Sequence, residues 1–133
     1  MSIDRLSNMV SMIKNASMAK KPVVEIMQTK ECEAVAKVLK EAGFLSVVKT
    51  FKAEKASYKM LHLELAKDEF GDFILTDAIR VSKPGRRIYK NHSNIKKVAN
   101  GFGLSVITTS RGIMSGDQAR TKKLGGEIIC EVK

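Results

Sequence analysis

The chain has 133 residues, is 44% hydrophobic, and carries 24 Lys and Arg against 14 Asp and Glu, a formal net charge of +10. This length fits one domain or two small lobes, and no apolar run approaches the roughly 18 residues of a membrane span. The N-terminus also lacks the basic start and apolar block of a signal peptide, so we expect a cytoplasmic protein without membrane contact.

The positive charge is concentrated in the second part of the chain. Residues 1–73 hold 12 basic and 10 acidic side chains, whereas residues 74–133 hold 12 basic and only 4 acidic ones, a net of +8. So many like charges on one part of the chain repel one another and disfavour the compact state. The excess of positive charge therefore indicates a polyanionic partner. Because no basic helix with a bulky apolar face is present, nucleic acid is favoured over a membrane surface.

The N-terminal part shows the periodicities of helix, strand, helix, strand and strand, in that order. The expected elements are a helix over 4–21, a strand over 22–27, a helix over 29–44, and strands over 44–52 and 58–66 that form a hairpin. Ser2 or Asp4 is expected to cap the first helix. Thr29 is expected to cap the second, and Gly43 to end it with a left-handed residue.

The C-terminal part is mainly β. We expect strands over 73–82, 86–90, 104–110, 112–115 and 127–132, with short helices over 93–99 and 117–124. Ser93 and Asp117 are the expected caps of these helices, and Gly125-Gly126 is expected to end the second. The polar stretch 67–72 is the expected boundary. The predicted fold is therefore α+β, with an N-terminal α/β lobe (1–70) packed against a mainly β, RNA-binding C-terminal lobe (71–133).

Catalysis is disfavoured by the residues at hand. Ser110 lacks the G-x-S-x-G elbow that exposes a hydrolase serine, although a hydrolase using Ser110 is one alternative. His62 lies in a predicted strand, and His92 lies in a basic neighbourhood that opposes a general base. Cys32 and Cys130 lie among apolar residues outside any zinc or redox spacing. We expect no enzyme, no metal and no cofactor.

A basic turn is one candidate binding element. The stretch "SKPGRRIYK" holds four cationic side chains within eight residues. If Ile88 faces the core, strand alternation turns Arg87 and Tyr89 outward together, where guanidinium and ring can pair with phosphate and pack on a sugar or base. The alternative is a solvated charged turn with Tyr89 at the core edge.

The stretch "LSVITTSRGIMSG" places three hydroxyls and a guanidinium at the tip of an apolar ribbon. Side-chain hydroxyls match the 2′-hydroxyls of RNA, which both donate and accept, and Arg111 can make a bidentate phosphate contact. Gly112 lets the backbone turn and approach closely. Residue chemistry alone leaves RNA contact and a plain hairpin turn equally open.

The chain closely resembles the eighth protein of the small ribosomal subunit, in its bacterial form. "TTSRGIM" stands where that family has a Ser-Thr-Ser-Lys-Gly-Val-Met loop, and the resemblance extends through "VLKEAGF", "RVSKPGRRIYK" and "LGGEIICEV". It implies an RNA-contacting set of residues. These are Thr108, Thr109, Ser110, Arg111 and Gly112 of the loop, Lys83, Pro84, Gly85, Arg87 and Tyr89 of the basic turn, Gly125, Gly126 and Glu127, and Lys14 and Asn15 on the first helix. The charges of Arg86 and Lys90 in the same turn add these two residues to the expected RNA contacts.

The resemblance also implies a function. It points to a structural constituent of the small subunit that binds an irregular helix in the 16S ribosomal RNA central domain during assembly. It further implies repression of the protein's own operon messenger RNA and proximity to the fifth and twelfth small-subunit proteins. Thr108 replaces a serine of the family pattern and Arg111 a lysine, and Met12 and Arg5 also depart from it. A non-ribosomal messenger RNA-binding regulator is the alternative.

Overall fold

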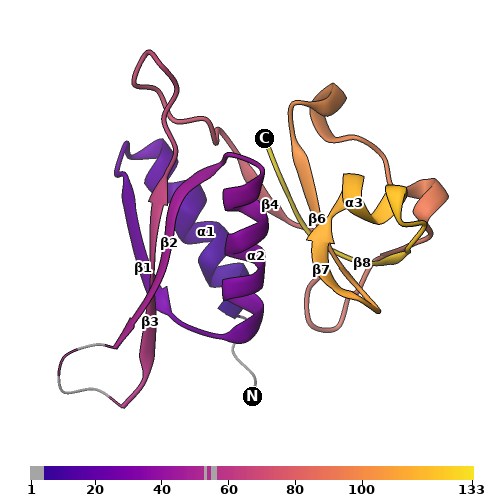
Figure 1. Ribbon diagram of the computed structural model, residues 1–133, viewed down its shortest axis with the longest axis horizontal. Helices are drawn as coiled ribbons and strands as arrows, with labels where there is room; N and C mark the ends of the chain where they lie inside the picture. Colours follow the sequence, from indigo (N-terminus) through magenta and orange to yellow (C-terminus); the bar gives the residue numbers. More distant parts are fainter. Residues whose placement is uncertain (1–4, 53, 55–56) are drawn as a thin grey trace.

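A computed structural model describes residues 5–52, 54 and 57–133 (Figure 1), so the expected caps Ser2 and Asp4 lie outside the described residues. Its helices and strands are α1 (Arg5–Met18), β1 (Val23–Met27), α2 (Lys30–Glu41), β2 (Leu45–Lys52), β3 (Lys59–Leu65), β4 (Ala78–Arg80), β5 (Tyr89–Lys90), β6 (Leu104–Thr109), β7 (Gly112–Ser115), α3 (Gly116–Thr121) and β8 (Gly126–Val132). The predicted α+β class is confirmed, with the helices α1 and α2 before a β-rich C-terminal part. In the described part of the chain, no helix has the length and apolar character needed to cross a membrane.

The helix α2 begins and ends as its sequence predicts. The Thr29 hydroxyl accepts a hydrogen bond from the Cys32 N–H at 3.1 Å, which satisfies one of the free donors of the first turn. At the other end Gly43 takes a φ of +90°, and the Phe44 N–H donates to the Leu39 carbonyl at 2.9 Å. A hydrogen bond to the carbonyl five residues earlier, across a residue in the left-handed region, is the mark of a Schellman motif.

The N-terminal sheet is antiparallel, in the order β1-β3-β2. In β3 the side chains of Leu61, Leu63 and Leu65 are buried and those between them are partly exposed, as the alternation predicts. Figure 1 shows α1 and α2 between this sheet and the C-terminal part, and α1 contacts β4 while α2 contacts β7. The two helices therefore join the two sheets.

The C-terminal sheet has the order β4-β8-β6-β7, and β5 also pairs with β8. Between β6 and β8 the register shifts, because Val106 lies opposite Cys130 but Ile107 lies opposite Ile128. Ile129 is the extra residue of this β-bulge, which changes the alternation along β8. As a result Ile129 and Cys130 both belong to the main core.

One hydrophobic core takes residues from both halves of the chain. It joins side chains of α1, α2 and β3 to those of β6 and β8, Val106 and Val132 among them. Cys32 and Cys130 are completely buried in it, and burial raises the pKa of the Cys130 thiol to about 12. The division into lobes at residue 70 stays a prediction.

Several element boundaries differ from the sequence prediction. The strand expected over 73–82 is confined to Ala78–Arg80, and the helix expected over 93–99 is two 3-10 turns, His92–Asn94 and Val98–Gly101. Ser93 is not a cap, because the first of these turns starts after Asn91 and has no side-chain cap hydrogen bond. A stretch this short gains too little from helix propagation to form a regular α-helix.

The cap of α3 is also different. Ser115, and not Asp117, precedes the helix. Its hydroxyl accepts a hydrogen bond from the Gln118 N–H, and its own N–H donates to the side-chain Oε1 of Gln118. This reciprocal pair is a capping box. The last residue of α3 is Thr121 and its C-cap is Lys122, followed by Lys123 in the left-handed region at φ +55°, so the helix ends before Gly125.

Candidate nucleic-acid interface

The loop between β6 and β7 is a tight hairpin whose tip is Ser110-Arg111. Thr109 pairs with Gly112, and Gly112 takes a φ of +108° with open space where a Cβ would stand. The positive φ of Gly112 is a backbone conformation that glycine adopts without steric cost. The Thr109 hydroxyl accepts from the Arg111 N–H at 3.1 Å and donates to the Gly112 carbonyl at 2.9 Å. The loop is thus held from within, with Ser110 and Arg111 exposed at its tip.

The basic turn is formed by Lys83–Arg86. The Arg86 N–H donates to the Lys83 carbonyl at 2.9 Å, Pro84 supplies the first central residue, and Gly85 takes a φ of +84° at the second. Proline followed by a left-handed glycine defines a type II turn. The lysine and arginine side chains at its two ends are exposed.

The strand that leaves the turn is anchored by Ser82. Its buried hydroxyl accepts from the Ile88 N–H at 3.0 Å, and Ile88 itself is half-buried. Tyr89 is 68% exposed and Arg87 is also exposed, so the predicted outward orientation of this pair is confirmed.

The glycine pair allows the backbones of β5, β6 and β8 to meet. A Cβ at Gly126 would stand 2.1 Å from the Thr108 carbonyl oxygen, and one at Gly125 would stand 2.7 Å from the Lys90 carbonyl oxygen. Neither contact is possible for a larger residue without moving backbone. The two glycines therefore place the start of β8 directly against the loop strand on one side and the basic-turn strand on the other.

Three segments distant in sequence form one row across the sheet. Tyr89 of β5 lies opposite Glu127 of β8, which in turn lies opposite Thr108 of β6. Glu127 is only 8% exposed, and its carboxylate accepts from the Arg87 guanidinium at 3.1 Å and 3.3 Å. The carboxylate thus fixes the guanidinium over the row. We call the loop 108–112, the turn and strand 83–90, and residues 125–127 the candidate surface.

A groove of about 530 Å³ extends the candidate surface toward the helices, and we call it the inner groove. Pro84, Arg87 and Thr108 line one side, and Arg5 and Lys30 line the other. Sequence reasoning did not select Lys30. A signal was present, however, because Lys30 is the first residue of α2, where the helix dipole disfavours a cation.

Comparison with known proteins identifies the family. The model of the family described as ribosomal protein S8 matches residues 4–132. The chain belongs to the ribosomal protein S8 family. It is 39% identical over 133 residues to the small ribosomal subunit protein uS8c of Spirogyra maxima, and the match covers 99% of each chain. It is also 38% identical to uS8 of Nitratidesulfovibrio vulgaris over 97% of each chain, and 37% identical to uS8 of Rhodopirellula baltica over 99% of each.

In this S8-family chain, two residues predicted to bind RNA lie apart from the others. Lys14 pairs with Asp77 at 3.2 Å and lowers the pKa of that carboxyl, and Asn15 is its exposed neighbour on α1. Asp77 adjoins Lys133 at the end of β8, whereas the candidate surface lies at the start of that strand. Seven strand residues separate the two ends by roughly 20 Å. The structure therefore does not bring Lys14 and Asn15 together with the loop.

Proposed function

We propose that this S8-family protein is a non-catalytic structural component of the small ribosomal subunit that binds 16S ribosomal RNA through the candidate surface. The observation that carries the proposal is the Tyr89–Glu127–Thr108 row, which brings together the β6–β7 loop, the basic turn and the glycine pair. These segments are the ones in which charge, hydroxyl content and family resemblance pointed to RNA. Their convergence supports a single binding surface.

The chemistry of the surface fits a folded RNA. The exposed Ser110 hydroxyl can donate to or accept from a 2′-hydroxyl in a wide, shallow minor groove. Arg111 and Arg86 carry exposed charges that match phosphates on either side of such a contact. Tyr89 offers a ring face for a sugar or an unstacked base. Hydroxyl, cationic and aromatic groups therefore lie together on the candidate surface.

The role of Glu127 in this proposal is to position Arg87. A buried carboxylate among cations is unusual on a surface that binds a polyanion, since it would repel phosphate if left unpaired. The ion pair neutralises it and holds the guanidinium in one orientation. Arg87 is still 58% exposed at its side chain, so its remaining N–H groups are available to RNA.

The finer parts of the proposal follow the family resemblance. The proposed RNA site is an irregular helix of the central domain, bound during assembly, and the fifth and twelfth small-subunit proteins are the proposed neighbours. Repression of the protein's own operon messenger RNA would use the same surface, because an RNA that imitates the ribosomal helix presents the same groups to it.

The test is a binding series with the full chain and a transcript of the 16S central domain. Ser110→Ala is expected to weaken binding by on the order of 1–3 kcal/mol, about 5- to 150-fold in Kd, because it removes one or two hydrogen bonds without changing charge. Ser57→Ala, at an exposed serine between β2 and β3, is the matched control and should bind as the wild type does. Wild-type affinity in the Ser110→Ala protein, measured by filter binding, would remove the loop from the proposed interface.

A further inference from the structure

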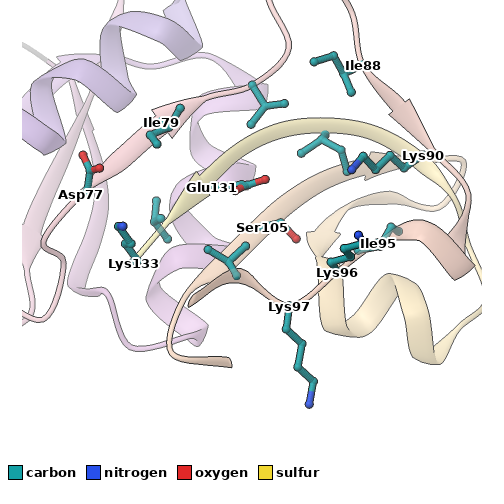
Figure 2. A pocket seen from close by; sticks show the side chains of 14 residues that line it. Asp77, Ile79, Ile88, Lys90, Ile95, Lys96, Lys97, Ser105, Glu131 and Lys133 are labelled. Carbon is teal, nitrogen blue, oxygen red and sulfur yellow. The ribbon is translucent and has the colours of Figure 1, made fainter. Parts of the chain in front are cut away.

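The outer face of the C-terminal sheet carries a second groove, of about 510 Å³, which we call the outer groove (Figure 2). Ile79 of β4 lies opposite Glu131 of β8, which lies opposite Ser105 of β6, and all three line this groove. Thr108 and Glu127 line the inner groove instead. The outer groove is thus separate from the inner groove and from the row of the candidate surface, although Ile88 and Lys90 of the strand after the basic turn also line it.

The floor of the outer groove is aliphatic. Ile79 is 52% exposed although it lies in a strand, and Val81 and Ile88 are half-buried beside it. Ile95 and Ile128 complete this floor from the 3-10 turn region and from β8. Branched aliphatic side chains gathered in a concave site offer apolar area that a partner can cover.

The rim of the outer groove is cationic. Lys90, Lys96, Lys97 and Lys133 surround the floor, and all four are exposed. Within residues 5–52, 54 and 57–133, none of these four ammonium groups makes an ion pair. Of the two carboxylates that line the groove, the one on Asp77 is already paired with Lys14. The rim therefore has cations to offer an acidic partner.

We infer that the outer groove binds an extended segment of another protein, one that carries aliphatic side chains flanked by Asp or Glu. The aliphatic floor matches the apolar side chains, and the lysine rim matches the carboxylates. Figure 2 shows Glu131 and Ser105 in the middle of the groove, where carboxylate and hydroxyl can accept backbone N–H groups of such a segment.

The lining itself favours protein over RNA. Single-stranded RNA is held by bases that stack on aromatic rings or on arginine planes. The side chains that line the outer groove include neither aromatic residues nor arginine. Since the two grooves lie on different faces of the sheet, a protein segment in the outer groove leaves the β6–β7 loop and Arg87 open to RNA.

The test is a titration of the full chain, labelled with ¹³C at its isoleucine methyl groups, with an eight-residue peptide of alternating Asp and Val. The methyl signals of Ile79, Ile88 and Ile128 are expected to shift with increasing peptide, while Ile113 in the inner groove stays unchanged. A peptide of alternating Lys and Val should bind at least tenfold more weakly. The double variant Lys96→Glu/Lys97→Glu should lower the affinity for the acidic peptide by a similar factor.

Three results would overturn the inference. One is a lack of any shift at Ile79 with the acidic peptide. Another is equal binding of the acidic and basic peptides, which would remove the role of the rim. The third is a uridine octanucleotide that shifts Ile79 and competes with the acidic peptide, since it would assign the groove to RNA. The double variant Lys49→Glu/Lys52→Glu, at two exposed lysines of β2, is the charge-matched control and should leave peptide binding unchanged.

Discussion

The hydroxyl groups of the β6–β7 loop have different tasks. The Thr109 hydroxyl is used inside the loop, where it joins the Arg111 N–H to the Gly112 carbonyl. The Ser110 hydroxyl is exposed, and no hydrogen bond engages it in the described part of the chain. Sequence reasoning treated the two as equivalent RNA contacts, because which hydroxyl folds back on the backbone depends on turn geometry that the sequence does not specify.

Substitution of Thr109 tests this division. Thr109→Val keeps the branched shape but removes both loop hydrogen bonds, so we expect the free energy of unfolding to fall by about 1 kcal/mol. Affinity for the central-domain RNA should fall as well, because the loop loses its fixed shape. Thr109→Ser restores the hydroxyl and should retain most of both properties. Urea denaturation and filter binding measure the two effects, and an unchanged stability in Thr109→Val would contradict the structural role.

A second residue-scale prediction concerns His62. Hydrogen bonds to Glu25 at 2.9 Å and then to Glu64 at 3.2 Å raise the pKa of this imidazole above its ordinary value of about 6.5. The stabilisation this provides is therefore complete below about pH 6.5 and is lost as pH rises through the raised pKa. His62→Gln should be less stable than the wild type at pH 5.5, and the difference should shrink by pH 8.5.

The measurement is urea denaturation of both proteins at the two pH values. Lys49, which lies opposite His62 on β2, is present in both proteins, so its charge cancels in the comparison. A stability difference that stays constant across this range, or grows with pH, would contradict the assignment.

At the scale of elements, the sequence predicts whatever is set by local periodicity. Every regular element of the first 65 residues was expected in the right order, because each has an apolar pattern of period 3.6 or 2 and clear end signals such as Thr29 and Gly43. The short elements after residue 66 were less predictable. Residues 73–77 read as part of a strand, but only Ala78–Arg80 pairs with β8 as a strand.

The capping of α3 gives a test at this scale. Ser115 and Gln118 form a capping box, and their S-x-x-Q spacing is visible in the sequence, although the sequence prediction assigns the cap to Asp117. Ser115→Ala should lower the free energy of unfolding by about 1 kcal/mol. Asp117→Asn should cost less than half of that, because the exposed Asp117 side chain contributes only through the helix dipole and a surface ion pair with Arg120, both of which are weak. Thermal or urea denaturation of the two variants should give this order, and the reverse order would favour the aspartate cap.

At the scale of the whole molecule, the candidate surface depends on contacts that no local pattern contains. Tyr89, Glu127 and Thr108 become neighbours only through strand pairing and the β-bulge at Ile129. The sequence predicted most of the members of the surface, in part through family resemblance, but not the ion pair between Arg87 and Glu127. Lys14, a predicted RNA contact on the first helix, lies apart from this surface and pairs with Asp77 at the far end of β8, so its contact with RNA stays a prediction.

The ribosomal assignment makes one whole-molecule prediction. A protein that binds 16S RNA through its C-terminal surface should be held in small subunits by that surface. Ser110 and Arg111 lie at the exposed tip of the loop, so removing both side chains should weaken this attachment without disturbing the core.

Sedimentation of a cell lysate through a sucrose gradient tests this most directly. The tagged wild-type chain is expected to migrate with the small ribosomal subunit, and Ser110→Ala/Arg111→Ala to move largely to the top fractions while keeping a wild-type melting temperature. A wild-type chain that stays at the top of the gradient would contradict a ribosomal function, and a double variant that migrates fully with the subunit would contradict the loop as its RNA contact.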